Sequence, residues 1–160
     1  MSTRGAVGFR CGCVDKIAYN HWDSYPSGLG HSVLDYLKDK TLNELKDEFE
    51  DINLISEHNE YGWNGIGFNH EFQDASDFLR DSLFCEYAYI INLDDKALEF
   101  YTGFNRDKEA NGRYVFCDNP TKLSDGSLLY GVAIKQEIPL NEVFEGKWKV
   151  NAEDDGFVKL

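Results

Sequence analysis

The alternation of apolar and polar residues predicts two β-hairpins, one at the start of the chain and one in its second half. Apolar positions alternate over residues 6–19, with a turn expected at 14–16. The alternation returns after residue 86, where residues 94–96 have the composition of a hairpin turn. In this second half, strands are expected at 87–93, 98–101, 113–117 and 128–138. Since hairpin neighbours run antiparallel, the sheet is expected to be mainly antiparallel.

Helical spacing of apolar residues predicts helices between the two hairpins. Val33, Leu34 and Leu37 recur at intervals of one and three residues. Thr41 with Glu44 has the spacing of a capping box and predicts the start of a second helix. Further helical segments are expected at 74–84 and 139–144. The order of strands, helices and strands predicts an α+β fold, in which a mainly antiparallel sheet built from hairpins has about three helices packed on one face.

The length of 160 residues fits a single domain over 1–160, because no repeat or linker divides the chain. Residues 145–160 are expected to form a tail or an edge segment. No apolar run approaches the roughly 20 residues that a membrane helix needs, and the N-terminus has no apolar signal-peptide core. We therefore expect a cytoplasmic protein without a membrane partner.

The chain is acidic, with 29 Asp and Glu against 16 Lys and Arg and a net charge of −13. Such a surface repels phosphates and anionic lipids, so direct nucleic-acid binding is not expected. Two interpretations stay open. The acids either form an ordinary solvent-exposed surface, or they imitate a nucleic acid and occupy the basic site of a partner protein. Their even spread over both halves of the chain favours the first.

The four cysteines are expected to stay reduced in a cytoplasmic protein and to act as small buried hydrophobes. Cys11 and Cys13, if both lie in one strand, point to the same face and resemble half of a metal site. No second pair of ligands at metal-site spacing accompanies them. We expect no metal site and no cofactor.

The segment 19–31 concentrates polar side chains between a strand-like run and a helical pattern. Loops held between rigid elements are where binding and catalytic groups gather. His21, Asp23 and Ser24 are too close in sequence for a linear catalytic triad, and hydrogen bonding to a polar ligand suits them better. The alternative is a scaffold, in which Asp23 and Ser24 cap the turn and His21 satisfies a buried neighbour.

The ligand hypothesis predicts a cleft formed by the 19–31 loop that binds a small polar or anionic ligand. The backbone N–H groups of 28–31, at the start of a helix, suit an anion. Residues 61–68 are rich in Gly, Asn and aromatics without a clear period, and we expect them to form a lid. Tyr25 and Trp63 are expected to stack on the ligand, and Arg4 or Arg113 to supply charge. The predicted ligand-binding residues are Arg4, Asn20, His21, Asp23, Ser24, Tyr25, Ser27, His31, Trp63 and Arg113.

An enzymatic alternative uses the chain start. Removal of Met1 would leave Ser2 with its own α-amine as base, as in N-terminal nucleophile hydrolases. Asn20 or Asn92 would then donate to the oxyanion. The phosphate-binding, metalloprotease, hydrolase and dinucleotide motifs that mark common enzyme classes do not occur.

Four segments resemble a group of small proteins encoded by bacteriophages, prophages and some bacteria. They are TRGAVGF at 3–9, YNHWDSYPSGLG at 19–30, EYAYIINLD at 86–94 and EFYTGF at 99–104. The resemblance covers most of the chain. It implies a phage or mobile-element setting, in which a small acidic protein acts on a host protein in host takeover or counter-defence. It implies no mechanism.

Overall fold

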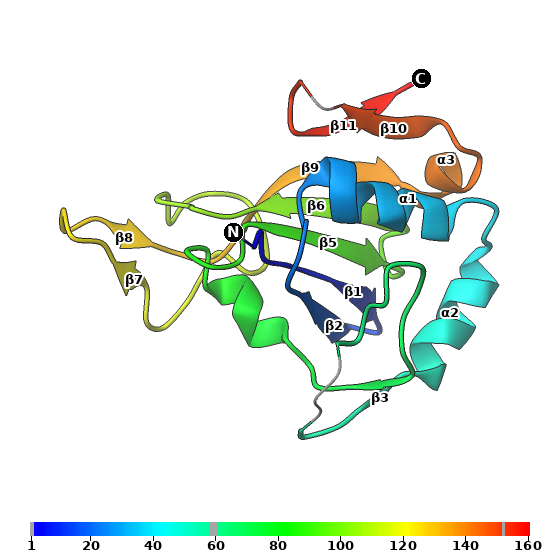
Figure 1. Ribbon diagram of the computed structural model, residues 1–160, viewed down its shortest axis with the longest axis horizontal. Helices are drawn as coiled ribbons and strands as arrows, with labels where there is room; N and C mark the ends of the chain where they lie inside the picture. Colours follow the sequence, from blue (N-terminus) through cyan, green and yellow to red (C-terminus); the bar gives the residue numbers. More distant parts are fainter. Residues whose placement is uncertain (1, 58–60, 152) are drawn as a thin grey trace.

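The computed structural model of the protein describes residues 2–57, 61–151 and 153–160. Its central sheet has five strands in the order β2-β1-β5-β6-β9 (Figure 1). These strands are β1 (Gly5–Cys11), β2 (Val14–Asn20), β5 (Tyr87–Asn92), β6 (Ala97–Thr102) and β9 (Ala133–Pro139). Neighbouring strands are antiparallel except β1 and β5, which are parallel. The predicted α+β fold with a mainly antiparallel sheet is confirmed.

Both predicted hairpins are present, but the turn of the first is not at 14–16. Gly12 and Cys13 form it, with φ values of 59° and 62°. Two positive φ values are typical of the two-residue turn that matches strand twist. The Asp94 carboxylate accepts hydrogen bonds from both backbone N–H groups, at 2.7 and 2.9 Å. Cys13 therefore lies in the turn, and the expected pairing of its thiol with Cys11 on one strand face is wrong.

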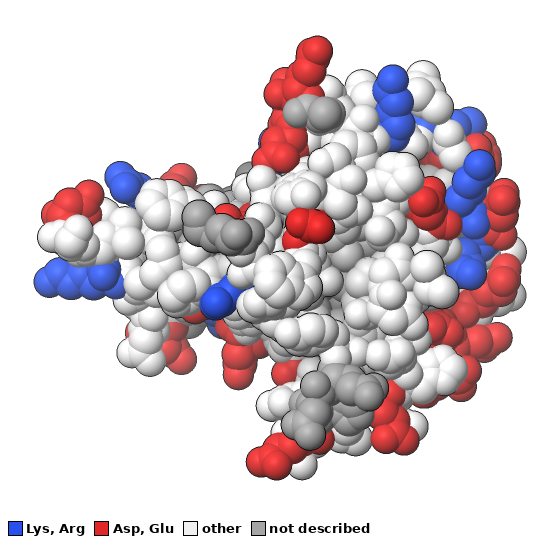
Figure 2. All heavy atoms as spheres, in the orientation of Figure 1, with Lys and Arg blue, Asp and Glu red and all other residues white. Residues whose placement is uncertain are grey.

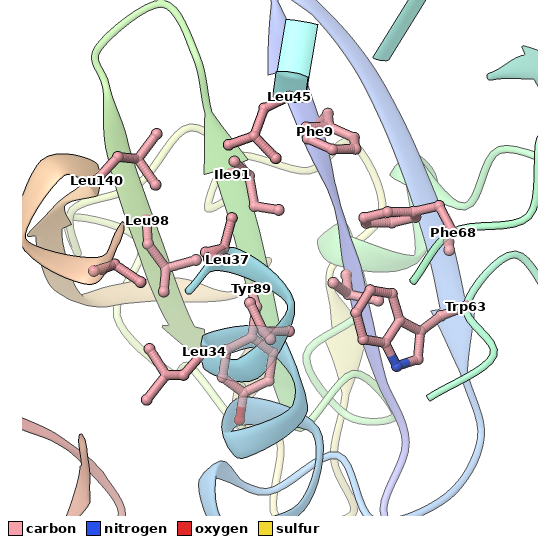
Figure 3. Packing of buried hydrophobic residues seen from close by; sticks show 14 of the residues in the cluster. Phe9, Leu34, Leu37, Leu45, Trp63, Phe68, Tyr89, Ile91, Leu98 and Leu140 are labelled. Carbon is pink, nitrogen blue, oxygen red and sulfur yellow. The ribbon is translucent and has the colours of Figure 1, made fainter. Parts of the chain in front are cut away.

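Three α-helices contribute to the core on one face of the sheet, as the sequence predicts. They are α1 (His31–Leu37), α2 (Leu42–Asp51) and α3 (Leu140–Phe144). Figure 1 shows α1 in front of the sheet, and Figure 3 shows Leu37 and Leu45 beside Phe9 of β1 and Ile91 of β5. Thr41 caps α2 by accepting a hydrogen bond from the N–H of Glu44 at 3.2 Å. None of the described helices is long and apolar enough to cross a membrane.

The helix expected at 74–84 is only the short 3-10 helix η2 (Ser76–Arg80), and it belongs to the core on the opposite face. Leu79 of η2 is fully buried there with Ala6 and Ile90 of the sheet. Asp74 fixes the approach to η2, because its carboxylate accepts a hydrogen bond from the N–H of Ile17 at 2.9 Å. After Arg80 the N–H of Ser82 donates to the carbonyl oxygen of Tyr130 at 3.3 Å, outside the helical pattern, so the helix does not extend to residue 84.

The structure also differs from the sequence prediction at 113–117 and 128–138, where two continuous strands were expected. Residues 113–117 form no strand, since a turn at 113–114 is followed by irregular backbone. The second stretch divides into β8 (Leu128–Leu129), which pairs with β7 (Thr121–Lys122), and β9. The division falls at Gly131, where a Cβ atom would lie 1.5 Å from the carbonyl oxygen of Tyr114. Close contact between the two backbones takes the chain out of the sheet at this point. One further short pair, β3 (Asn53–Leu54) with β4 (Glu71–Phe72), is parallel.

Residues 145–160 were expected to form a tail or an edge segment. They form a hairpin of β10 (Trp148–Asn151) and β11 (Gly156–Lys159) that contributes to the core on the helical face. Phe157 is buried, and its ring packs edge-on against Tyr89 and Phe100, with centroids 6.1 and 5.4 Å away. The Gln136 side chain of β9 bonds both the N–H and the C=O of Phe157, each at 2.8 Å. One buried aromatic and two hydrogen bonds thus hold this hairpin on the domain.

Candidate functional site

A cleft of about 510 Å³ lies between residues 20–32 and residues 61–65. Half of the ten predicted ligand-binding residues line it: Asn20, Asp23, Ser27, His31 and Trp63. They come from the end of β2, the following loop, the start of α1 and the 61–68 segment. The lining residues Trp22, Ser32 and Asn64 were not among the predicted ones. The structure therefore brings together groups that are distant in sequence, at the loop that the sequence analysis selected.

The loop is folded tightly back on itself between β2 and the π-helical turn η1 (Pro26–Gly30). Asp23 has a φ of 53°, in the left-handed region that few residues adopt. Its carbonyl oxygen accepts a hydrogen bond from the N–H of Leu29 at 2.8 Å. A Cβ atom on Gly28 would lie 2.2 Å from that same oxygen. Only glycine at position 28 allows this close approach of the two backbone segments, and Asp23 is among the residues that line the cleft.

Ser24 attaches the loop to the sheet. Its side chain is fully buried, and its carbonyl oxygen accepts a hydrogen bond from the Tyr89 hydroxyl at 2.8 Å. Burial raises the pKa of Tyr89 well above its ordinary value, so the phenol remains a donor. Asn20 Nδ2 donates to Ser24 Oγ at 2.9 Å. Ser24 therefore has the scaffold role and does not line the cleft.

Replacing Tyr89 by Phe is expected to lower the free energy of unfolding by about 1–3 kcal/mol, because the buried carbonyl of Ser24 would lose its donor. Urea unfolding followed by circular dichroism measures the change. The control is Tyr25→Phe, which removes a surface hydrogen bond to Asp23 and is expected to change stability by less than about 0.5 kcal/mol. Equal losses from both variants would show that the Tyr89 hydroxyl does not hold the loop.

Aromatic rings form one side of the cleft. Trp22 is 62% exposed and Tyr61 is 49% exposed, and both line it. The His21 ring lies between them, edge-on to Trp22 at a centroid distance of 4.5 Å and within 9° of parallel to Tyr61. His21 Nδ1 also shares a hydrogen bond with the Tyr19 hydroxyl at 2.7 Å. His21 thus orients the two exposed rings and does not itself line the cleft.

The 61–68 segment, expected to form a lid, forms one wall of the cleft. Trp63 is only 5% exposed, and its ring packs edge-on against Phe68 and Tyr36 at centroid distances of 5.0 and 5.6 Å. Figure 3 shows the indole nitrogen of Trp63 on the ring edge away from Phe68. Asn64 closes the turn by accepting hydrogen bonds from the N–H groups of Ile66 and Gly67, at 3.0 and 2.9 Å.

The charges expected from two arginines are not in the cleft. The Arg4 guanidinium lies over the ring of Phe84, 5.3 Å from its centroid, and Arg113 binds Glu99 on the other face of the sheet. Tyr25 also does not line the cleft, since its hydroxyl donates to Asp23 at 3.1 Å. Among the described lining residues there is no Lys or Arg. The cleft itself therefore favours a neutral ligand over an anion.

Arg113 belongs to a polar network on the second face of the sheet, which the sequence analysis missed. Its members are Arg10, Asp15, Asn92, Glu99, Tyr101, Arg113 and Tyr114. The Glu99 side chain is only 3% exposed and receives two hydrogen bonds from Arg113, at 2.8 and 2.5 Å. Burial by itself raises the pKa of Glu99, but the hydrogen bonds and charge of Arg113 outweigh it and hold the pKa below its ordinary value. Because Glu99 and Arg113 are paired, we assign the network a structural role.

The nucleophile hypothesis for Ser2 receives no support. The Asn20 amide already donates to Trp22 O and Ser24 Oγ, and the Asn92 amide donates to Asp95 and Glu99. Met1, whose removal the hypothesis requires, lies outside the described residues. In the described part of the chain, no group of three or more His, Cys, Asp or Glu is arranged to hold a metal ion.

No protein-family model, curated protein or solved structure matches this chain. The resemblance to phage-encoded proteins therefore stays a prediction. The function must be argued from the chemistry of the cleft.

Proposed function

We propose that the protein binds a small polar compound that contains a ring, and that it does so in the cleft between residues 20–32 and 61–65. The observation that supports this most directly is the convergence of Asn20, Asp23, Ser27, His31 and Trp63 on one hollow of about 510 Å³. Pockets for small molecules have volumes of roughly 300–1,000 Å³, with a few polar groups beside aromatic walls. The proposal is for binding, and it assigns no reaction.

The lining suits a ligand that combines a flat face with hydroxyl or amino groups. Trp22 and Tyr61 offer exposed ring faces on which a sugar or a base can stack. The Asp23 carboxylate accepts one hydrogen bond from Tyr25 and retains acceptor capacity for a ligand O–H or N–H. Monosaccharides and nucleosides both have this chemistry, and the experiment below distinguishes them.

The three tryptophans of the chain report on binding separately. Trp22 and Trp63 line the cleft, and Trp148 lies on β10 outside it. In an ¹H–¹⁵N spectrum, titration with a nucleoside such as adenosine or a sugar such as glucose is expected to shift the indole signals of Trp22 and Trp63 and to leave that of Trp148 in place. A ligand series without such shifts at millimolar concentration would contradict the proposal.

Substituting Trp22→Ala is expected to weaken binding about tenfold or more, because a stacked ring contributes roughly 1–3 kcal/mol. The stability is expected to change little, since the side chain is mostly exposed. Phe116→Ala is the matched control: this ring is more exposed still and does not line the cleft. Calorimetric titration of both variants, with the compound that shifts the Trp22 and Trp63 signals in that titration, measures the difference. If both variants bind as well as the unmodified protein, Trp22 does not stack on the ligand.

An acidic interaction protein that acts on a host partner is the alternative. Exposed acids on α2 include Glu44, Asp47, Glu50 and Asp51. Figure 2 shows Asp and Glu side chains gathered at the edge of the molecule where α2 lies, with others at separate edges of the same face. A nucleic-acid mimic needs acids aligned on one surface, so a partner of this kind would bind at α2. We favour the ligand-binding proposal because the cleft brings together polar and aromatic groups from separate segments.

A further inference from the structure

A second hollow adjoins the cleft at His31. It has a volume of about 180 Å³ and lies between α1 and β10. Its polar lining residues are His31, Asp35, Lys38, Trp148 and Lys149. We call this hollow the basic pocket. His31 lines both the basic pocket and the cleft, so the two hollows are neighbours at this residue.

The lining of the basic pocket contains two lysines, Lys38 and Lys149, and one acid, Asp35, so its formal charge is opposite in sign to that of the whole protein. The Asp35 carboxylate lies 3.3 Å from His31 Nδ1. Neither Lys38 nor Lys149 has a carboxylate within ion-pair distance in the part of the chain that the structure describes. The nearby lysines 147 and 159 are instead paired with glutamates, at 2.6 and 3.1 Å. Figure 2 shows Lys and Arg side chains gathered on the side of the molecule where α3 and β10 lie.

Lys38 lies close to the turn that borders the basic pocket. Gly146, in the turn between α3 and β10, has a φ of 72°. A Cβ atom built on it would lie 3.7 Å from Lys38 Cε, so the lysine stem crosses directly above this glycine. The Trp148 ring forms part of the wall, and its Nε1 donates to Glu142 at 3.0 Å. Two cationic groups beside a fixed aromatic wall suit a compact anion.

We propose that the cleft and the basic pocket form one site with two parts. The ring of the ligand stacks in the cleft, and a phosphate monoester on that ring lies between Lys38 and Lys149. The ligand class is then a phosphorylated ring compound, such as a nucleoside monophosphate or a sugar phosphate. This inference rests on the proposed function. The described lining of the cleft contains no Lys or Arg, and in the two-part site the neighbouring basic pocket supplies the positive charge that an anionic ligand needs.

Matched probes with and without the phosphate test the proposal. The pairs are adenosine with adenosine monophosphate, and glucose with glucose 6-phosphate, and inorganic phosphate is titrated alone. In the pair whose ring fits, the phosphorylated member is expected to bind about tenfold more tightly and to shift the Trp148 indole signal as well as those of Trp22 and Trp63. The gain is expected to shrink as salt is raised from 0.05 to about 0.5 M, because mobile ions screen exposed charges.

Charge-removing variants identify the groups responsible. In the double variant Lys38→Gln, Lys149→Gln, the tenfold ratio between the two members of the pair is expected to fall to about one. The control is Lys122→Gln on β7, an exposed lysine that does not line the pocket, and it is expected to keep the full ratio. All these lysine side chains are exposed, so the variants are expected to fold.

The outcomes separate this inference from the proposed function. Equal affinities within every pair, with shifts at Trp22 and Trp63, would overturn the two-part site and leave the cleft proposal standing. A tenfold ratio that persists in the double variant would also overturn it. If phosphate shifts Trp148 while no ring compound shifts Trp22 or Trp63, both proposals fail.

Discussion

Replacing Glu99 by Gln is expected to lower the free energy of unfolding by about 3 kcal/mol. The Glu99 side chain is nearly fully buried and accepts hydrogen bonds from Arg113, Asn92 and Tyr101. Gln keeps the volume but removes the charge, which leaves the partly buried Arg113 guanidinium without its counter-charge. Removing one partner of a buried ion pair typically destabilises a protein by about 3–5 kcal/mol. Urea unfolding at pH 7 measures the difference.

The same carboxylate makes stability depend on pH. Because Arg113 holds the pKa of Glu99 below its ordinary value of 4.5, the unfolded chain takes up a proton at a higher pH than the folded protein. The stabilisation is fully present above pH 4.5 and is lost as the pH falls through the folded pKa. The unmodified protein is therefore expected to lose more stability between pH 5 and about 3 than Glu99→Gln does.

The control for both measurements is Glu50→Gln, an exposed position on α2. It removes the same charge from the surface, where substitutions usually change stability by less than about 0.5 kcal/mol. If Glu99→Gln and Glu50→Gln have the same stability at every pH, the buried network does not stabilise the fold.

The fold was predictable where its signals are local. Alternation within residues 6–19 is sufficient to define a hairpin, and the Thr41 capping group defines the start of α2. The parallel pairing of β1 with β5 has no such signal, because it joins strands from different hairpins across the intervening helices. The 74–84 helix prediction failed for a similar reason, because the N–H of Ser82 bonds the carbonyl oxygen of the distant Tyr130 and not a helical partner.

The candidate site was predictable as a region but not residue by residue. The density of polar groups in 19–31 identified the loop. Which side chains face the cleft depends on the left-handed turn at Asp23, and composition does not reveal that turn. The Ser24 side chain is buried against Gly5 of β1, whereas Ser27 lines the cleft. The lysines of the basic pocket, Lys38 and Lys149, are far apart in the sequence, so only the packing of β10 against α1 brings them together.

Phe68→Ala is expected to have the largest effect on the wall of the cleft. The Phe68 side chain is only 6% exposed, and its ring packs against Phe9, Trp63 and Tyr36 at centroid distances of 4.8, 5.0 and 5.6 Å (Figure 3 labels the first two). Truncating a buried phenylalanine leaves a cavity and typically lowers the free energy of unfolding by about 3–5 kcal/mol. Urea unfolding measures this loss. Phe68→Leu fills much of the cavity and is expected to recover part of it.

The consequence for binding follows from the position of Trp63, which Phe68 supports from behind. In Phe68→Ala the indole is expected to become mobile, so its signal in the ¹H–¹⁵N spectrum should move or broaden while that of Trp148 remains sharp. Ligand affinity is expected to fall by about tenfold even at temperatures where the variant is fully folded, because an ordered wall must then form on binding. Phe116→Ala truncates a ring that is 74% exposed, and it is expected to change neither the Trp63 signal nor the ligand affinity. If Phe68→Ala loses stability but keeps the Trp63 signal and full ligand affinity, other contacts hold Trp63 in place and Phe68 contributes only to the stability of the core.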